Sequence, residues 1–274
     1  MHDNLINSEL GKKSSYAHHY APELLFPVPR AVNREAIGIH GSLPFYGHDL
    51  WNAYEISWLN NKGKPMVAIG EFISPCTAVH IFESKSLKLY LNSFNNTRFD
   101  TSDAVAATIQ KDLANLAGER VTVRLHLLSK INNIDTGTFN GECLDSLDIT
   151  INEYTVNPEL LTTEETEVSE SLYSNLLKSN CPITGQPDWA SVHIIYSGQK
   201  INHENLLRYL ISFRNHNEFH EHCVERIFMD IKRRCNPAKL TVAACFTRRG
   251  GIDINPIRTT ERNPPYHNQR QWRQ

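Results

Sequence analysis

The sequence predicts an α+β protein in which an antiparallel ββααββ unit, with its helices on one face, occurs twice in tandem. Three observations support this fold class. Strand-like and helix-like segments follow each other in the same order in both halves of the 274-residue chain. Short residue patterns recur at one constant offset between the halves. An acidic segment without apolar periodicity separates them, and the length suits two domains of about half the chain each.

The first half begins with residues 1–46, which are polar and weakly periodic and are predicted to form an irregular arm. Strands and helices are expected to follow, with a turn at residues 60–65 between the first two strands. The expected strands are 51–59, 66–72, 121–128 and 149–156, and the expected helices are 84–94 and 102–116. Ser102 is the candidate N-cap of the second helix, and Gly118 follows its end.

The segment at 158–170 is predicted to be a linker, because it carries several glutamates that repel one another and extend the chain. The first module would then cover residues 47–157 and the second module residues 171–274. The second half is expected to contain a short helical run at 171–177, strands at 191–196, 240–247 and 252–257, and helices at 204–213 and 217–235.

The two halves share residues as well as element order. One set in the first half recurs 119 residues later, and three residues of a predicted strand recur at the same offset. The recurring pairs are Leu87/Leu206, Tyr90/Tyr209, Leu91/Leu210, Ser93/Ser212 and Phe94/Phe213, followed by Val121/Leu240, Thr122/Thr241 and Val123/Val242. Matches in the same order at one offset indicate a tandem duplication.

Composition excludes several classes of function. A net charge of −2 and a pI near 6.7 give no electrostatic footprint for nucleic acid. No apolar run approaches the roughly 18 residues of a membrane span, and the N-terminal residues lack the pattern of a signal peptide. Six cysteines without a framework of spacings indicate reduced thiols and a cytoplasmic protein.

Cys181 lies in a segment that Pro182, Gly185 and Pro187 exclude from regular structure. A stiff loop of this kind can hold a thiol and the Asp188 carboxylate in one place. The thiolate is the reactive form, and an unperturbed thiol supplies only a few per cent of it at neutral pH, so a nearby acid–base group or cation is needed. Asp188 and Lys178 are the local candidates. A buried packing cysteine is the alternative interpretation.

Three further segments carry candidate chemistry. Glu83, Ser84 and Lys85 stand at a strand-to-helix junction, where free amides and a lysine favour an anion, although a solvated lysine face is the alternative. His216 and His220 are spaced as metal ligands could be, yet the zincin pattern is absent. The segment 248–251, Arg-Arg-Gly-Gly, offers guanidinium forks and close backbone approach to a phosphate. The sequence contains no dinucleotide fingerprint and no P-loop.

Four segments together resemble the NADPH-dependent 7-cyano-7-deazaguanine reductases, the QueF family, in its long two-module form. These segments are residues 83–90 (ESKSLKLY), 181–189 (CPITGQPDW), 213–221 (FRNHNEFHE) and 248–251 (RRGG). The resemblance implies tandem tunnelling-fold modules, a homodimer, and no direct contact with nucleic acid or membrane. It also implies reduction of the nitrile of 7-cyano-7-deazaguanine to 7-aminomethyl-7-deazaguanine, on the pathway to the queuosine base of tRNA, with two NADPH consumed in turn.

The resemblance also implies residue roles. Cys181 would add to the nitrile carbon as a thioimide, and Asp188 would be the proton donor. Phe82, Glu83, Ser84, His220 and Glu221 would contact the substrate, whose ring N–H donors suit carboxylate acceptors. Ser84, Lys85, Arg249 and Gly250 would contact NADPH, and no metal is expected. Two other interpretations are a zinc-dependent hydrolase of the GTP cyclohydrolase type and a non-catalytic purine- or pterin-binding module.

Overall fold

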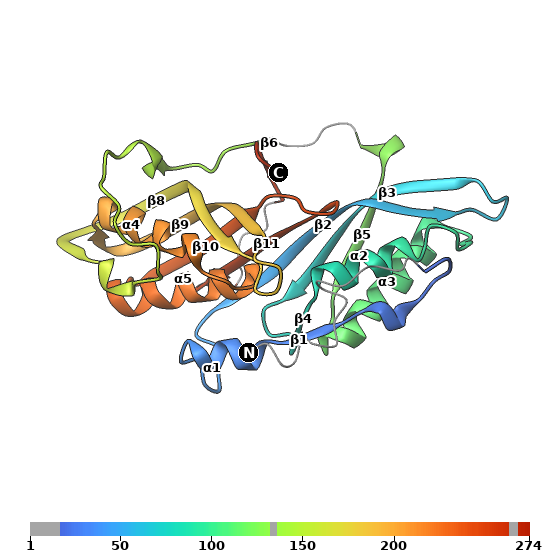
Figure 1. Ribbon diagram of the computed structural model, residues 1–274, viewed down its shortest axis with the longest axis horizontal. Coiled ribbons are helices and arrows are strands. Elements are labelled where there is room, and N and C mark those ends of the chain that lie inside the picture. The colour runs from blue at the N-terminus through green and yellow to red at the C-terminus, as the bar shows by residue number, and fades with distance from the viewer. Residues whose placement is uncertain (1–16, 132–135, 263–267) are drawn as a thin grey trace. The chain divides into compact units, whose positions relative to one another are not determined.

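The computed structural model describes residues 17–131, 136–262 and 268–274 (Figure 1). By its contacts the chain divides into two compact units. Unit 1 consists of the described residues within 1–32, 48–134 and 248–254, and unit 2 of those within 33–47, 135–247 and 255–274. This division differs from the boundaries predicted from the sequence, because residues 135–157 belong to unit 2 and residues 248–254 to unit 1.

Unit 1 is built on three antiparallel strands in the order β5 (Thr122–Leu127), β3 (Pro65–Pro75) and β2 (Tyr46–Leu59). Helices α2 (Ser84–Asn92) and α3 (Ser102–Ala117) pack on one face of these strands (Figure 1). Their apolar residues are spaced by three and four, so each helix presents one continuous stripe to the sheet. The shared core is formed by Trp51, Ile56, Phe72, Leu87, Tyr90, Val105, Ile109 and Leu113, among others.

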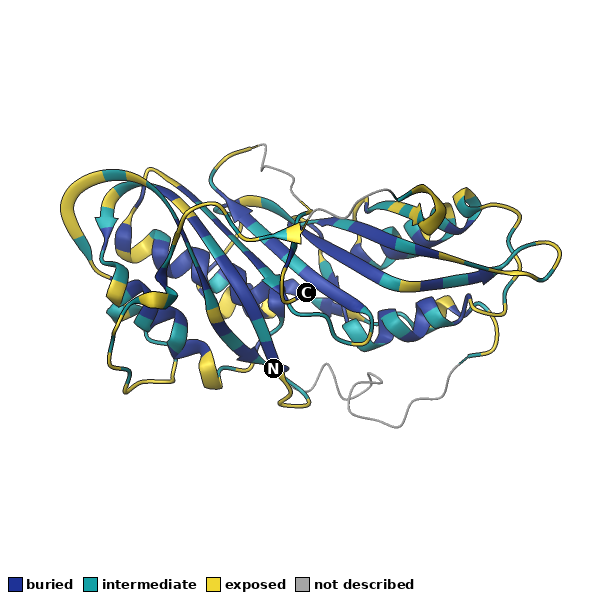
Figure 2. Cartoon of the chain, turned by 90° about the horizontal axis from the view of Figure 1, so that it is seen from above, coloured by how far each residue is buried: buried dark blue, intermediate teal, exposed yellow. Residues whose placement is uncertain are grey.

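Unit 2 contains strands in the order β11 (Ile252–Thr259), β10 (Lys239–Phe246), β9 (Pro187–Ile201), β8 (Thr163–Asn180) and β7 (Glu142–Cys143). The first three residues of β11 belong to unit 1. Helices α4 (His203–Ser212) and α5 (His220–Cys235) complete the unit. The middles of the long strands are buried, α5 is buried on nearly all sides from His220 to Ile231, and the connections are mostly exposed (Figure 2).

The remaining elements are short. They are β1 (Pro27–Pro29), which pairs with β4 (His80–Phe82), helix α1 (Arg30–Ala36), β6 (Thr136–Gly137), which pairs with β12 (Arg270–Gln271), and 3-10 turns at Pro22–Leu24, Leu128–Lys130, Leu144–Ser146, Pro158–Leu160 and Phe213–Asn215. The prediction of an irregular arm was therefore wrong for part of 17–46, while residues 1–16 lie outside the described residues.

The predicted helical run at 171–177 was wrong, because these residues form the second half of β8 and pair with β9. The pairing shifts register between Ser174 and Leu177. This bulge moves the buried positions from Leu172 and Ser174 to Leu177 and Ser179. A one-residue bulge inside a strand breaks the period of two and places leucines at a spacing that resembles a helix.

Two other sequence expectations were wrong. Residues 149–156 form no strand: their exposure alternates only over 149–152, residues 152–155 are all exposed, and no described strand pairs with them. Residues 163–170 are the exposed beginning of β8 and not part of a linker. The other predicted helices and strands are confirmed, mostly with small shifts at their ends, but β9 (Pro187–Ile201) extends well beyond the predicted 191–196 at both ends and β2 begins at Tyr46 instead of residue 51. The N-cap of α3 is Thr101, whose side chain accepts from the Ala104 amide at 3.1 Å, and not Ser102.

The residue matches between the halves correspond to matching contacts. In unit 1, the Tyr90 hydroxyl donates to Asp112 at 2.6 Å, and the Tyr90 ring lies edge-on to Phe94 at 5.2 Å. In unit 2, the Tyr209 hydroxyl donates to Asp230 at 2.7 Å, and its ring meets Phe213 at 5.4 Å in the same manner.

A second match in each half was missed from the sequence. The string Pro-Glu-Leu-Leu occurs at 22–25 and again at 158–161, and both copies form a 3-10 turn. The residue before each string donates its amide to a serine at the end of a helix, Ala21 to Ser93 at 3.1 Å and Asn157 to Ser212 at 3.3 Å. These paired interactions support the inference that the two halves arose by duplication.

Candidate active site

Cys181 and Asp188 belong to one β-hairpin of unit 2. Cys181 follows the last residue of β8, and Asp188 is the second residue of β9, opposite Ser179. The Cys181 amide donates to the Gln186 carbonyl at 2.9 Å, and the Gly185 amide donates to the Cys181 carbonyl at 3.0 Å. These bonds close the loop on itself and hold both chemical groups on the same rigid connection. Both side chains are buried, with 3% and 4% of their surface exposed.

His220 joins this pair from α5, of which it is the first residue. Its Nε2 lies 3.3 Å from the Asp188 Oδ2, and its ring stacks on Phe246 of β10 at 4.0 Å between centroids. The stacking fixes the plane of the imidazole next to the carboxylate, although the geometry between the two groups is not that of a hydrogen bond. Glu221 follows directly and is 1% exposed. Unit 2 therefore brings together Cys181, Asp188, His220 and Glu221 within one hairpin and the adjoining helix start.

Two buried carboxylates position the beginning of α5. Glu218 accepts from Arg226 in a bidentate pair at 2.9 and 3.0 Å and from His216 at 3.0 Å. Burial alone would raise the pKa of Glu218, but these donors lower that pKa to about 2. The Glu218 amide also donates to the Asn180 carbonyl at 3.1 Å, which joins the residues before α5 to the end of β8. His216 is therefore an ion-pair partner here.

Glu225, one turn after Glu221, is fully buried between two guanidinium groups. Arg34 donates to both of its oxygens at 2.7 and 2.9 Å, and Arg258 donates to Oε1 at 2.8 and 3.1 Å. All of these residues lie in unit 2. The cluster ties α5 to α1 and β11 through charge-assisted hydrogen bonds, so it fixes the axial position of the helix that carries His220 and Glu221.

Glu83 of unit 1 is the N-cap of α2. Its two carboxylate oxygens accept from the Lys85 amide at 2.8 Å and from the Ser86 amide at 2.7 Å. The side chain is fully buried, and burial raises its pKa, while the two amides and the charges of Lys85 and Arg249 act in the opposite direction. The preceding Phe82 is also buried, and its ring lies 5.5 Å from that of Trp51.

The segment Arg248-Arg249-Gly250-Gly251 forms a tight turn in unit 1. The Arg249 and Ile252 backbones exchange hydrogen bonds at 2.9 and 3.0 Å, and both glycines between them have positive φ, +56° and +77°. Two such residues in succession are the requirement of the type I′ hairpin turn, which explains both glycines. A Cβ on Gly251 would also lie 2.5 Å from the Glu55 carboxyl carbon.

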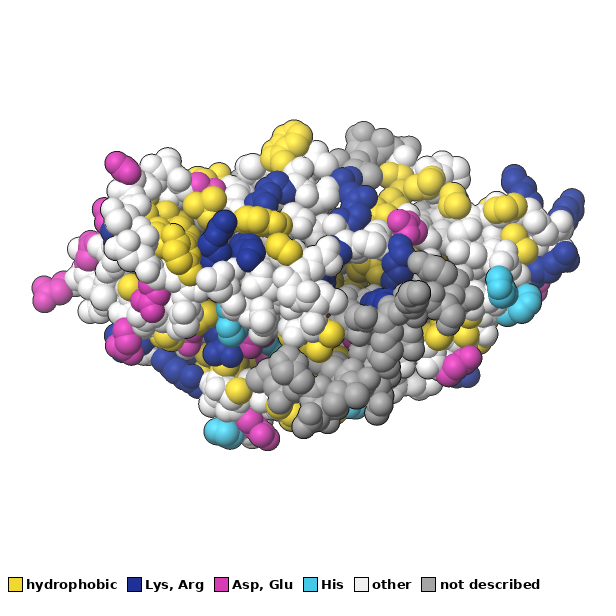
Figure 3. All heavy atoms as spheres, viewed as in Figure 1, with side chains coloured by type: hydrophobic (Ala, Val, Ile, Leu, Met, Phe, Trp, Pro, Cys, Tyr) yellow, Lys and Arg dark blue, Asp and Glu magenta, His cyan; other side chains and the backbone are white. Residues whose placement is uncertain are grey.

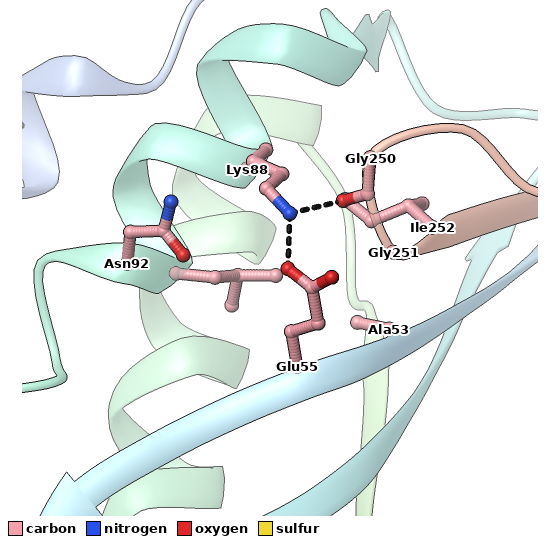
Figure 4. Close-up of a pocket in the computed structure, with 8 residues that line it drawn as sticks. Ala53, Glu55, Lys88, Asn92, Gly250, Gly251 and Ile252 are labelled. Atoms are coloured by element: carbon pink, nitrogen blue, oxygen red, sulfur yellow. Dashed lines mark hydrogen bonds and ion pairs between the residues drawn. The ribbon is translucent and has the colours of Figure 1, made fainter.

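Lys88 links this turn to α2 (Figure 4). Its Nζ donates to the Gly250 carbonyl and to the Glu55 carboxylate, which lies on β2. The Arg248 guanidinium lies over the Tyr54 ring at 4.0 Å from its centroid. Unit 1 therefore brings the Glu83–Lys88 segment and the Arg248–Gly251 segment together, although they are far apart in the sequence. A small, open pocket of about 10 Å³ lies between them, lined by Ala53, Glu55, Lys88, Leu91, Asn92, Gly250, Gly251 and Ile252.

Sequence reasoning missed two features of these sites. The His220–Asp188 contact joins residues that are distant along the chain, and no local pattern indicates it. Glu55 lies on a predicted strand and carries no motif, so its ion pair with Lys88 was not foreseen. The shared site between Glu83 and Glu221, which lie in different units, stays a prediction.

Charge is scattered on the visible surface. Figure 3 shows Lys and Arg side chains in several separate groups with acidic side chains between them. Across residues 17–131, 136–262 and 268–274, no three or more His, Cys, Asp or Glu side chains gather as a metal site would require. In the same ranges, no helix is long and apolar enough to cross a bilayer.

The chain matches two family models and is similar to curated proteins along nearly its whole length. Residues 16–125 match the family model for the nitrile reductase, 7-cyano-7-deazaguanine-reductase N-terminal region, and residues 187–265 match that of the QueF-like proteins. The chain is 55% identical to the NADPH-dependent 7-cyano-7-deazaguanine reductase of Coxiella burnetii (strain RSA 493 / Nine Mile phase I), over 97% of this chain and 96% of that protein. The chain belongs to the family of NADPH-dependent 7-cyano-7-deazaguanine reductases.

Relatives from other bacteria agree. The reductases of the same name from Legionella pneumophila (strain Lens) and Dechloromonas aromatica (strain RCB) are each 55% identical to this chain. They align over 95% and 97% of this chain and over 93% and 95% of their own lengths. The crystal structure of the archaeosine synthase QueF-Like in the apo form matches 38% of this chain and 100% of its own, at 18% identity and a TM-score of 0.31.

Proposed function

We propose that this protein reduces the nitrile of 7-cyano-7-deazaguanine to the primary amine of 7-aminomethyl-7-deazaguanine with two molecules of NADPH. Membership of the reductase family supports this activity. The observation that carries the proposal is the hairpin that holds Cys181 and Asp188, with His220 of α5 placed 3.3 Å from the Asp188 carboxylate. A thiol, a carboxylate and an imidazole on fixed backbone are the groups that nucleophilic addition with proton transfer requires.

In the proposed mechanism, the Cys181 Sγ adds to the nitrile carbon, and the nitrile nitrogen gains a proton. Asp188 takes the thiol proton and passes a proton to that nitrogen, which gives a covalent thioimide. Bound NADPH supplies hydride, and two hydrides with two further protons convert the thioimide to the free amine and release the thiol. His220, held by stacking on Phe246, orients the Asp188 carboxylate between these transfers.

Glu83 and Glu221 are proposed to accept hydrogen bonds from the ring N–H groups of the substrate. The position of Glu83 supports this role, because glutamate is not one of the residues preferred at a helix N-cap. At the corresponding place before α4, the N-cap is Asn202, whose side chain accepts from the Asn205 amide at 3.0 Å. Asn, Asp, Ser and Thr are the preferred caps, so a buried glutamate at this position is locally disfavoured. A local departure of this kind is typical of a functional residue.

The cofactor contacts are proposed at the junction of the two motifs in unit 1. Ser84 is the first residue of α2, where amides favour an anion, and Lys85 and Arg249 both act electrostatically on Glu83. Gly250 presents backbone at the turn that Lys88 holds. Lys85 and Arg249 would bind the 2′-phosphate that distinguishes NADPH from NADH. Two tandem tunnelling-fold modules, a homodimer and a cytoplasmic location complete the proposal.

The decisive experiment separates the covalent step from turnover. Protein mixed with 7-cyano-7-deazaguanine in the absence of NADPH is expected to gain the mass of one substrate at Cys181, because no hydride is available to carry the reaction further. Cys181→Ala should lose both this adduct and NADPH oxidation at 340 nm. Asp188→Asn should bind substrate but form adduct slowly, since an amide cannot exchange the proton.

A matched control is Cys245→Ala, which removes another thiol of unit 2 outside the hairpin. It should keep both adduct and turnover. Full turnover by Cys181→Ala, or an adduct that maps to another cysteine, would refute the mechanism even if the protein reduced the nitrile.

A further inference from the structure

A group of three cations surrounds Trp189 on the face of unit 2 opposite Asp188. Lys178 of β8 and Trp189 of β9 are directly paired, so their side chains share one face of the sheet. Asp188 and Ser179 are the adjacent pair and point to the other face, because successive side chains alternate. This face is therefore separate from the side that carries His220.

Two guanidinium groups approach the indole ring. The Arg214 Cζ lies 5.6 Å from the ring centroid, and the Arg273 Cζ lies 5.5 Å from it, both within the range of a cation–π contact. Arg214 belongs to the 3-10 turn Phe213–Asn215, and the Asn180 amide donates to the His216 carbonyl at 2.8 Å just beyond that turn. The backbone on which Arg214 stands is thereby fixed to the end of β8.

Arg273 comes from the C-terminal segment, to which the sequence assigned no role. The Gln274 side chain donates to the Phe246 carbonyl at 3.0 Å and accepts from the Gln271 amide at 3.0 Å. Both glutamines are buried, whereas Arg273 between them is exposed. Arg273 also donates to the Asn175 carbonyl at 2.6 Å. The segment is therefore anchored on both sides of a guanidinium that it places at the ring.

Within the described part of the chain, these three cations have no carboxylate partner, in contrast to several other cations of unit 2. Among the described residues, the side chains of Lys178, Arg214 and Arg273 form no ion pair, and the Lys178 Nζ donates only to the Asn180 side chain and the Arg214 carbonyl. Other cations of the unit have such partners, as in Arg208–Glu204, Arg226–Glu218, Arg234–Glu159 and Lys239–Glu261.

The crowding has an electrostatic consequence. Burial and the Arg214 guanidinium lower the pKa of Lys178, while Asp188 acts in the opposite direction. Holding three like charges together around one ring, with no carboxylate paired directly to any of them among the described residues, is unfavourable. A bound anion with several acceptor oxygens would remove this cost and would match the planar donors of two arginines.

We propose that Lys178, Arg214 and Arg273 form a binding site, with Trp189 as its floor, for the phosphate groups of a nucleotide. A phosphate offers the multiple acceptor oxygens that three cations can share, and the exposed arginines can reach it from solvent. If the proposed reductase function holds, NADPH is one source of such phosphates, and free phosphate compounds are the other.

The test is calorimetric titration of the full chain with inorganic pyrophosphate at low ionic strength. Arg273→Gln and Lys178→Gln should each weaken pyrophosphate binding by about tenfold, the effect of one charge-assisted hydrogen bond. The matched control is Arg208→Gln, which removes an arginine of the same unit that is paired with Glu204. Affinity in the control should equal that of the wild type.

Kinetics with NADPH then identify the source of the phosphate. If the dinucleotide occupies the site, Arg273→Gln raises the KM for NADPH about tenfold and leaves kcat unchanged, because a contact remote from the reacting carbon contributes uniform binding. An unchanged KM together with lost pyrophosphate affinity assigns the site to a free phosphate compound. Both results support an anion site.

Three results would overturn the proposal. They are the absence of pyrophosphate binding by the wild type, equal affinity in Arg273→Gln and the wild type, and equal weakening in the Arg208→Gln control. A change in sedimentation of Arg273→Gln without a change in pyrophosphate affinity would likewise overturn it, and would assign this face to self-association. Because the titration needs no turnover, its outcome is independent of whether the nitrile is reduced.

Discussion

Replacing Glu83 by asparagine separates its capping role from its proposed role in substrate binding, because asparagine is the cap that the second half uses at the corresponding place. Glu83 accepts two amide hydrogen bonds at 2.7 and 2.8 Å, and Asn202 accepts one at 3.0 Å. Loss of a helix cap costs about 0.5–2 kcal/mol of unfolding free energy, and asparagine is among the best caps. We expect Glu83→Asn to change the unfolding free energy by less than about 1 kcal/mol, and Tm by at most about 4 °C.

Substrate binding should respond far more strongly. A hydrogen bond to a charged group contributes about 1.5–3 kcal/mol, so loss of the carboxylate should raise the KM for the nitrile substrate by about tenfold to a hundredfold. Initial rates of NADPH oxidation at several substrate concentrations measure KM, and urea unfolding measures stability. Asn202→Ala is the control, since it should destabilise by about 1 kcal/mol and leave KM unchanged.

The pH dependence gives an independent check. Burial raises the pKa of Glu83 above its ordinary value, so the carboxylate takes up a proton at a higher pH than an exposed glutamate would. Protonation removes an acceptor, so substrate affinity should fall as pH falls through this raised pKa. The contribution of Glu83 to the unfolding free energy changes in the opposite direction. It rises as pH falls, because the folded protein binds this proton more tightly than the unfolded chain does. A KM for Glu83→Asn within twofold of the wild type, with the same pH profile, would refute the binding role.

Three further predictions concern unit 2. Glu225→Ala should lower the unfolding free energy by about 3–5 kcal/mol, because two buried guanidinium groups lose their partner. Glu204→Ala is the control, since it removes an exposed partner and should cost less than about 1 kcal/mol. Equal urea midpoints for the two variants would contradict this prediction. Glu218 has its pKa lowered to about 2 in the folded protein, so its ionised form stabilises the fold above its unfolded pKa near 4.5. On the order of 3 kcal/mol of unfolding free energy should be lost as pH falls from 4.5 toward 2. Glu218→Gln should flatten the fall of unfolding free energy with pH in an acid titration. Burial raises the pKa of Cys235 to about 11 and that of Cys223 well above its ordinary value, so neither thiol should react with iodoacetamide at pH 8. Rapid alkylation of either cysteine, found by mass mapping of the labelled protein, would show this to be wrong.

The sequence by itself determined most helices and strands, and it indicated the segments that are proposed to carry the chemistry. Helix α3 ends at Gly118 in the left-handed conformation, as its glycine predicts, because only a residue without a Cβ adopts that backbone freely. The recurrence of residues between the halves was visible because Tyr90 and Tyr209 make the same contacts with equivalent partners, so the packing of each half constrains the same positions. The spacing of apolar residues and the residues that cap a helix are local properties, so they can be read directly from the sequence.

Tertiary structure decided the features that depend on partners distant in the chain. Residues 171–177 pair with β9 across a bulge, and that pairing overrides their helix-like leucine spacing. His220 meets Asp188 only because α5 begins over the strand that carries that carboxylate. The Arg248–Gly251 turn lies against Lys88 in unit 1, although the sequence placed it with the second half. Such contacts depend on which strands pair and where helices pack. The spacing of residues along the chain does not show either of these.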